Sequence, residues 1–262
     1  MTDLDDGRTV MLPGSVAMPL VGFGTWQLRG SRGYEALRRA LAAGYRHIDT
    51  ATMYGNEAEV GRAVRDSGLD RRDVFITTKL PPGRAGQEER TLAESLRALD
   101  TDYVDLWLVH WPPRSDALLR TWERFRQARD QGHARSIGVS NYGTAELDRL
   151  IDASGEAPAV NQIRWAPSLH DPKRLAAHRE RGIVLEGYSP FKSSDLRDPA
   201  LTRIAEPHGV TTAQVVLRWH LEHGIPVIPK SQTPERIVAN LDVFGFELTA
   251  DEVAAIDGLS RT

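Results

Sequence analysis

Short apolar runs alternate regularly with amphipathic helical patterns along the chain, and this rhythm constrains the fold more than any other feature. The apolar runs, each typical of a buried β-strand, lie at residues 20–24, 45–48, 74–78, 103–109, 135–139, 159–163, 183–187 and 225–228. Strands that alternate with helices predict parallel βαβ units, and eight such units in about 250 residues predict a closed (β/α)8 TIM barrel. The length of 262 residues fits a single barrel domain over residues 1–262.

Two further elements are expected outside this alternation. Short apolar runs at 9–12 and 16–20, joined by Pro13-Gly14-Ser15, predict an N-terminal β-hairpin. Residues 249–259 predict an extra C-terminal helix. A doubly wound open sheet is the alternative fold. We disfavour it because Gly22-Phe23-Gly24-Thr25-Trp26 lacks the third glycine of the dinucleotide-binding motif Gly-x-Gly-x-x-Gly.

The composition narrows the kind of partner. Thirty-three basic and 36 acidic residues give a net charge of −3, which is too balanced for a nucleic-acid or membrane surface and favours a small molecule. The chain has no cysteine, which excludes disulfides, thiolate metal sites and cysteine nucleophiles. The acidic start does not resemble a signal peptide, and no apolar run approaches the ~20 residues that span a bilayer. We therefore expect a cytoplasmic protein that binds neither nucleic acid nor membranes.

Polar residues follow three successive apolar runs, at the strand ends where a barrel displays its catalytic groups. Asp49 follows the second run, and Tyr54 comes five residues later on the same strand-to-helix loop. Lys79 follows the third run and His110 follows the fourth. An aspartate cap and a surface tyrosine remain the simpler interpretation of Asp49 and Tyr54 taken alone.

Together these four residues predict a site that donates a proton. A free phenol has a pKa of about 10, which is too high for efficient acid catalysis near neutral pH. The ammonium of Lys79 beside Tyr54 would favour the phenolate and lower that pKa. Asp49 would keep the lysine charged, and His110 could orient a substrate carbonyl. Such a site needs a separate reductant, so the chain should also hold a binding place for one.

The segment after the eighth run predicts that binding place. Barrels often bind phosphate with the loops after strands seven and eight. Thr233 is a good N-cap and Pro234 a good first residue for the helix that follows. Arg236 then falls in the first helical turn, where a cation opposes the helix dipole by about 0.3–1 kcal/mol unless an anion binds there. An exposed arginine screened by salt is the alternative.

Several fragments resemble the aldo-keto reductase family in sequence, order and spacing. They are Gly22-Phe23-Gly24-Thr25-Trp26, His47-Ile48-Asp49-Thr50-Ala51, Thr77-Thr78-Lys79-Leu80, Asp102-Tyr103-Val104-Asp105-Leu106, His110-Trp111-Pro112, Ile137-Gly138-Val139-Ser140-Asn141, Asn161-Gln162, Tyr188-Ser189-Pro190 and Ile228-Pro229-Lys230-Ser231. The resemblance covers nearly the whole chain and fits a bacterial-type member with a short C-terminal tail. It implies a (β/α)8 barrel that reduces aldehydes and ketones with NAD(P)H and without a metal. Because Lys230, Ser231 and Arg236 converge on one helix start, we expect NADPH to be preferred over NADH. We expect a monomer.

The resemblance also implies a role for individual residues. Tyr54 would be the proton donor, with Asp49, Lys79 and His110 completing a tetrad. Ser140, Asn141 and Gln162 would hold the nicotinamide carboxamide, Tyr188 would stack on its ring, and Ser189 and Phe191 would line the pyrophosphate channel. Lys230, Ser231 and Arg236 would bind the adenosine phosphate and Asn240 the adenine. The remaining expected cofactor contacts are Thr25, Trp26, Asp49 and Pro190, while Trp26 and Trp111 match walls of the substrate pocket.

Two stretches depart from the family pattern. After Gln162 the family commonly has Ile/Val-Glu-x-His-Pro, but this chain has Ile163-Arg164-Trp165-Ala166-Pro167. Ala239 stands where an adenine-contacting glutamate usually precedes the asparagine. Two alternative functions stay open: a non-catalytic regulatory barrel that binds the cofactor, and an aldolase that uses Lys79 as a Schiff-base amine.

Overall fold

A computed structural model describes residues 7–113 and 117–260, in which eight parallel strands form one sheet in sequence order. The strands are β3 (Phe23–Gly24), β4 (His47–Asp49), β5 (Phe75–Leu80), β6 (Val104–Val109), β7 (Ala134–Ser140), β8 (Val160–Arg164), β9 (Val184–Tyr188) and β10 (Val227–Ile228). The first and last strands meet because Val21 pairs with Val227 and the Gly24 N–H donates to the Pro229 carbonyl over 3.0 Å. A Cβ on Gly24 would lie only 2.9 Å from the Ile228 carbonyl oxygen, so glycine permits this closure. The barrel prediction is confirmed.

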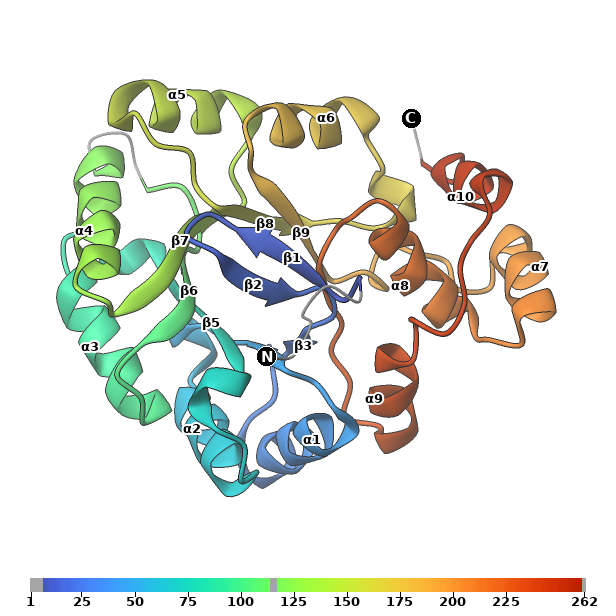
Figure 1. Cartoon of the computed structure of the whole chain (residues 1–262), viewed down its shortest axis with the longest axis horizontal. Helices are drawn as coiled ribbons and strands as arrows, with labels where there is room; N and C mark the ends of the chain where they lie inside the picture. The colour runs from blue at the N-terminus through green and yellow to red at the C-terminus, as the bar shows by residue number, and fades with distance from the viewer. Residues whose placement is uncertain (1–6, 114–116, 261–262) are drawn as a thin grey trace.

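Helices surround the sheet, as Figure 1 shows. They are α1 (Gly30–Ala43), α2 (Glu57–Asp66), α3 (Glu88–Leu99), α4 (Leu118–Asp130), α5 (Thr144–Ser154), α6 (Pro172–Glu180), α7 (Pro199–His208), α8 (Thr212–Glu222), α9 (Pro234–Leu241) and α10 (Ala250–Asp257). Each long helix buries one apolar stripe against the strands; on α1 the stripe is Ala36, Leu37, Ala40 and Leu41. The helices therefore cover the outer face of the sheet, and the two ends of the barrel remain as places for a functional site. Among the described residues, no helix combines the length and the apolar character of a membrane span.

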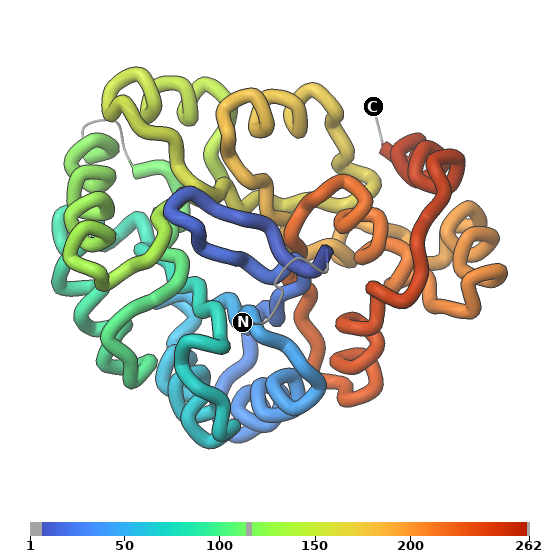
Figure 2. The backbone as a smooth tube through the Cα atoms, in the orientation of Figure 1, coloured from blue at the N-terminus to red at the C-terminus, as the bar shows by residue number. Residues whose placement is uncertain are grey.

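The predicted N-terminal hairpin is present as β1 (Thr9–Leu12) and β2 (Val16–Pro19), which pair antiparallel. Figure 2 shows it lying across one end of the barrel. Its buried side chains Leu12, Val16 and Met18 pack in one cluster with Phe75 and Leu106 of the strands. The hairpin thus plugs the barrel at one end and leaves the other end free for chemistry.

The predicted C-terminal helix is also present. Thr249 caps α10 by accepting from the Glu252 N–H over 3.3 Å. Figure 2 shows α10 beside α7 and α8, outside the helical ring. Asp257 fastens it there by accepting hydrogen bonds from the Trp219 indole (2.7 Å) and from His223 (2.8 Å).

Two strand boundaries differ from the sequence interpretation in a way that affects the site. The second strand begins at His47 rather than at residue 45, because the Tyr45 N–H still bonds to Ala40 at the end of α1. At their carboxyl ends the strands extend further than expected: Asp49 of β4 pairs with Thr77 of β5, and Lys79 of β5 pairs with Leu108 of β6. Asp49 and Lys79 are therefore strand residues and not loop residues. This placement fixes both side chains more firmly than a loop would.

Candidate active site

An ion pair between Lys79 and Asp49 lies at the base of the open barrel end. The Lys79 Nζ donates to both Asp49 carboxylate oxygens, over 2.7 and 2.6 Å, and to the Thr50 carbonyl over 2.9 Å. Lys79 is fully buried. Burial alone would lower the pKa of Lys79, but the negative charge of Asp49 and its hydrogen bonds to the ammonium outweigh burial and leave the pKa raised. Lys79 is therefore a permanent buried cation.

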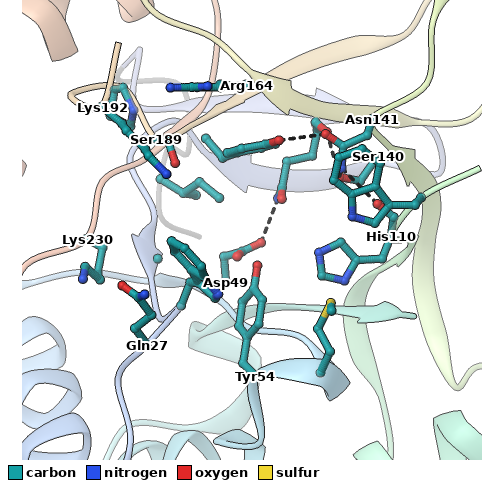
Figure 3. A pocket seen from close by; sticks show the side chains of 18 of the residues that line it. Gln27, Asp49, Tyr54, His110, Ser140, Asn141, Arg164, Ser189, Lys192 and Lys230 are labelled. Atoms are coloured by element: carbon teal, nitrogen blue, oxygen red, sulfur yellow. Dashed lines mark hydrogen bonds between the residues drawn. The ribbon is translucent and has the colours of Figure 1, made fainter. Parts of the chain in front are cut away.

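Tyr54 stands beside this pair, on a short 3-10 turn (Thr52–Tyr54) that follows β4. Figure 3 shows its hydroxyl pointing toward Asp49 in the pocket. The Lys79 Nζ lies 5.2 Å from the centre of the Tyr54 ring. Burial raises the pKa of Tyr54 by more than the charge of Lys79 lowers it, so the net shift is upward. The sequence argument predicted that Lys79 lowers the pKa of Tyr54, which is correct, but it did not include burial, which raises that pKa by more.

His110 completes the group, directly after β6 as expected. Its ring meets the Tyr54 ring edge-on, with the ring centres 5.8 Å apart. Burial, helped by the charge of Lys79, lowers the pKa of His110 to about 3. The imidazole is therefore neutral at physiological pH, with one ring nitrogen able to donate a hydrogen bond. The structure thus brings together the four residues that the sequence selected.

The loop that carries Tyr54 is held by Asn56, which sequence reasoning did not select. The buried Asn56 amide donates to the carbonyls of Thr25 (2.9 Å) and Leu28 (2.8 Å) and accepts from the Thr50 hydroxyl over 2.7 Å. These bonds tie the loop after β3 to the loop after β4. No local pattern signals them, because both carbonyl partners lie about 30 residues away in the chain.

A second polar wall faces the tetrad from β7, β8 and β9. The Tyr188 hydroxyl donates to Asn141 over 2.8 Å, and the Asn141 amide donates to Ser140 over 3.0 Å, bonds that Figure 3 marks. The Ser140 hydroxyl donates to the Gln162 carbonyl over 2.8 Å. The Gln162 side-chain amide reaches across the barrel and donates to Asp49 over 2.7 Å. This wall is therefore coupled to the tetrad through Gln162.

The two walls enclose a pocket of about 680 Å³. Its lining includes thirteen residues proposed from the sequence: Trp26, Asp49, Tyr54, His110, Trp111, Ser140, Asn141, Gln162, Tyr188, Ser189, Pro190, Phe191 and Lys230. Five others do not line it: Thr25, Lys79, Ser231, Arg236 and Asn240. The lining adds Gly24, Gln27, Met53, Arg164, Lys192 and Ile228. Trp26 is 49% exposed and Trp111 46%, as pocket walls rather than core residues would be.

Cationic side chains gather toward one side of this pocket. Arg164, Lys192 and Lys230 line it, and Arg236 is exposed in the first turn of α9, the helix that follows Lys230 in the chain. Within residues 7–113 and 117–260, none of these four forms an ion pair with a carboxylate, although the Lys192 ammonium lies 5.7 Å from the centre of the Trp26 ring. Unpaired cations at one rim suit an anionic ligand.

The start of α9 departs from one detail of the sequence interpretation. Thr233 occupies the N-cap position as expected, but its side chain makes no capping hydrogen bond. Instead the Ser231 hydroxyl accepts from the Thr233 N–H over 3.1 Å. Ser231 and Asn240 are both buried, whereas Arg236 is exposed. Ser231 thus shapes the helix start on which Arg236 stands.

One buried acid in this region was not foreseen. Glu186 points into the barrel from β9 and accepts a hydrogen bond from the Gln162 amide over 2.8 Å. It is fully buried. The sequence did carry a signal, since Glu186 is a charged residue inside the otherwise apolar run 183–187.

Comparisons with known proteins agree with this geometry. The model of the aldo/keto reductase family matches residues 20–261. An aldo-keto reductase of Mycolicibacterium smegmatis is 45% identical over 260 residues, which are 98% of this chain and 92% of the relative. A crystal structure of an aldo/keto reductase from Brucella melitensis has a TM-score of 0.92 at 44% identity, covering 96% of this chain and 99% of that one. The Bombyx mori aldo-keto reductase in complex with NADP has a TM-score of 0.90 at 34% identity, covering 96% of this chain and 92% of that one. The chain therefore belongs to the aldo/keto reductase family, whose members are NAD(P)H-dependent oxidoreductases.

Proposed function

We propose that this protein reduces aldehydes and ketones to alcohols with NADPH as the preferred reductant and Tyr54 as the proton donor. The observation that carries the proposal is the tetrad: a phenol in the pocket beside a permanent buried cation, with a neutral histidine at the same pocket. This arrangement provides an acid near a polarised carbonyl without a nucleophile or a metal ligand set.

The residues of the pocket fit a nicotinamide dinucleotide. Among the described residues, no side chain or backbone group donates to the Gln162 Oε1, which is therefore free to accept from a carboxamide. The unpaired cations at the rim suit the phosphates, with Lys230 and Arg236 on the side of α9. Ser140, Asn141 and Gln162 would hold the carboxamide, and Tyr188 would lie against the ring. When bound, the reduced cofactor supplies the hydride.

The chain's own residues supply the proton and the polarisation. Because its pKa is raised, Tyr54 keeps its hydroxyl proton at neutral pH until a carbonyl oxygen develops negative charge. The cation of Lys79 then stabilises the phenolate that forms, and Asp49 keeps the Lys79 ammonium in place. The neutral His110 can donate a hydrogen bond to the same carbonyl oxygen. Tyr54 thus gives the proton, Lys79 stabilises the charge that remains, and His110 polarises the carbonyl.

The two alternatives fit the structure less well. A Schiff-base aldolase needs an accessible neutral amine, whereas Lys79 is fully buried, paired with Asp49, and has a raised pKa. A non-catalytic cofactor-binding barrel has no use for a tyrosine hydroxyl poised at the centre of the pocket (Figure 3). The monomeric state and the cytoplasmic location stay predictions.

The test of the proposal is consumption of NADPH by the purified protein in the presence of a panel of aldehydes, ketones and dicarbonyls. We expect carbonyl-dependent oxidation of NADPH with formation of the matching alcohol. Absence of turnover across the panel, with NADPH binding intact, would favour the non-catalytic alternative. Trapping of an adduct on Lys79 by borohydride would favour the aldolase.

Replacing Arg236 with alanine should raise the KM for NADPH by about 10- to 100-fold, because a hydrogen bond to a charged group contributes about 1.5–3 kcal/mol. The KM for NADH, which lacks the 2′-phosphate, should change little. Arg97→Ala is the matched control, since Arg97 is an exposed arginine on α3. Steady-state kinetics with each cofactor give the comparison. An equal rise in both KM values would show that Arg236 does not recognise the 2′-phosphate.

A further inference from the structure

Glu186 is a carboxyl group that the proposed chemistry does not use, although it lies next to the tetrad. It is fully buried inside the barrel, on the strand that carries Tyr188 two residues later. The titratable groups that act on it or face it are His47 and Asp49 from β4 and Lys79 from β5. A carboxyl group in such a place is costly unless it is hydrogen-bonded or neutral. Its partners therefore indicate what it does.

The first partner is Gln162, whose side-chain NH₂ group has two hydrogens to donate. One goes to Asp49 Oδ2 over 2.7 Å and the other to Glu186 Oε2 over 2.8 Å. Both partners are carboxyl oxygens, so the NH₂ group faces them and the Oε1 faces away from them. The orientation of Gln162 is thus fixed by two acids, one from the tetrad and one outside it. Without Glu186, one of the two N–H groups would be left buried and unpaired.

A second neighbour of Glu186, the imidazole of His47, indicates that Glu186 carries a proton. The Nδ1 of His47 lies 3.3 Å from the Pro19 carbonyl, which can only accept, so Nδ1 bears the hydrogen and Nε2 is an acceptor. That Nε2 lies 3.1 Å from the Thr77 hydroxyl and 3.8 Å from Glu186 Oε1. Apart from this approach, Oε1 has no hydrogen-bond partner among the described residues. Oε1 thus receives no donor and faces the acceptor side of His47, which suits a neutral carboxyl group better than a carboxylate.

Burial supports the same state. Removal from water, reinforced by the negative charge of Asp49, raises the pKa of Glu186 to about 8, against smaller opposite effects of Gln162 and Lys79. Neutral Glu186 leaves Asp49 and Lys79 as a balanced pair beneath the pocket. Ionised Glu186 would add a second negative charge beside that pair and disfavour the negative charge that Tyr54 acquires on giving up its proton.

We propose that Glu186 is a positioning residue: as a neutral acid it holds the Gln162 amide so that Oε1 faces the cofactor carboxamide, and loss of its proton at alkaline pH slows carbonyl reduction. The inference rests on the proposed function, because it concerns the cofactor-facing atom of Gln162 and the proton of Tyr54. It assigns Glu186 no direct contact with substrate or cofactor.

Two substitutions of similar size separate this role from simple packing. In Glu186→Gln the new carbonyl can accept from Gln162 and the new NH₂ takes the place of Oε1 beside His47, so the side chain has the shape of the neutral acid but cannot titrate. In Glu186→Leu the hydrogen bond from the Gln162 amide is lost. Thermal unfolding of each variant with NADP⁺ bound checks that it is folded.

The expected results differ for the two variants. Glu186→Gln should bind NADP⁺ within about 2-fold of the native affinity. The kcat of the native protein should fall between about pH 7 and 9 as Glu186 loses its proton, and the kcat of Glu186→Gln should not. Glu186→Leu should weaken NADP⁺ binding by about 5- to 10-fold, the loss of one buried hydrogen bond. Infrared spectra at pH 6.5 should show a protonated carboxyl band that disappears at high pH and is missing from Glu186→Gln.

Any one of three results would contradict the proposed role of Glu186. An alkaline fall in kcat that persists unchanged in Glu186→Gln, absence of the protonated carboxyl band from the native protein, or native NADP⁺ affinity in Glu186→Leu would overturn it. The binding and infrared measurements do not depend on turnover. If the native protein reduces no carbonyl compound but the band and the loss of affinity are found, the proposed function fails while the positioning role of Glu186 stands.

Discussion

Replacing Tyr54 with phenylalanine should lower kcat for carbonyl reduction by about 10²- to 10⁴-fold, the range that a well-placed general acid contributes. The substitution removes only the hydroxyl. The ring should keep its edge-on contact with His110 and its place beside the ammonium of Lys79. The polar wall of Ser140, Asn141 and Gln162 is untouched, so the affinity for NADP⁺ should stay near the native value.

Two measurements test this expectation: turnover with NADPH and a reactive aldehyde, and quenching of tryptophan fluorescence by NADP⁺. Tyr34→Phe is the matched control, because the Tyr34 hydroxyl donates to Asp66 at the protein surface, away from the pocket lining. The control should turn over at the native rate. Turnover by Tyr54→Phe close to native would remove Tyr54 from the role of acid and leave His110 as the next candidate.

The fold and the tetrad were predictable for one physical reason. In a parallel barrel the carboxyl ends of all strands meet at the same rim, so residues far apart in sequence converge when each follows an apolar run. Asp49, Lys79 and His110 each follow or end such a run, and the structure brings them together. Tyr54 was predictable because it lies only five residues after Asp49 in the sequence, so a short loop keeps it near the end of the same strand.

The remaining parts of the site depend on facts that a strand pattern does not contain. Asn56 donates to backbone carbonyls of a loop far away in the sequence, and backbone groups cannot be recognised from the amino-acid sequence. Lys192 follows Ser189, a non-glycine residue with a φ of 55°, so the direction of that segment does not follow from periodicity. The charge of Glu186 inside an apolar run was a signal, but a strand pattern does not say which residues it contacts across the barrel. The net shift in the pKa of Tyr54 needed its burial, which only the structure gives.

Lys79→Met should give the largest loss of stability of any single change in the site. Methionine can fill much of the space, but it leaves the Asp49 carboxylate buried without its cation. Removing one partner of a buried ion pair typically costs about 3–5 kcal/mol in the free energy of unfolding. Carbonyl reduction should also be lost, because nothing then stabilises the Tyr54 phenolate. Urea unfolding gives the free energy, and Lys173→Met, at an exposed lysine on α6, is the control.

A second variant separates the structural from the catalytic part of this effect. In Lys79→Met with Asp49→Asn the buried charge is gone, while the carbonyl of the new side-chain amide can still accept from Gln162. Replacing both members of a buried pair is often close to neutral, so this double variant should regain most of the lost stability. It should remain inactive, because Tyr54, the proposed proton donor, then has no cation beside it. If the double variant were as unstable as Lys79→Met, the loss would come from packing rather than from the orphaned carboxylate. If it recovered turnover, the cation would not be needed by Tyr54. Together the single and the double variant separate what the Lys79–Asp49 pair contributes to stability from what the Lys79 cation contributes to the proposed acid, Tyr54.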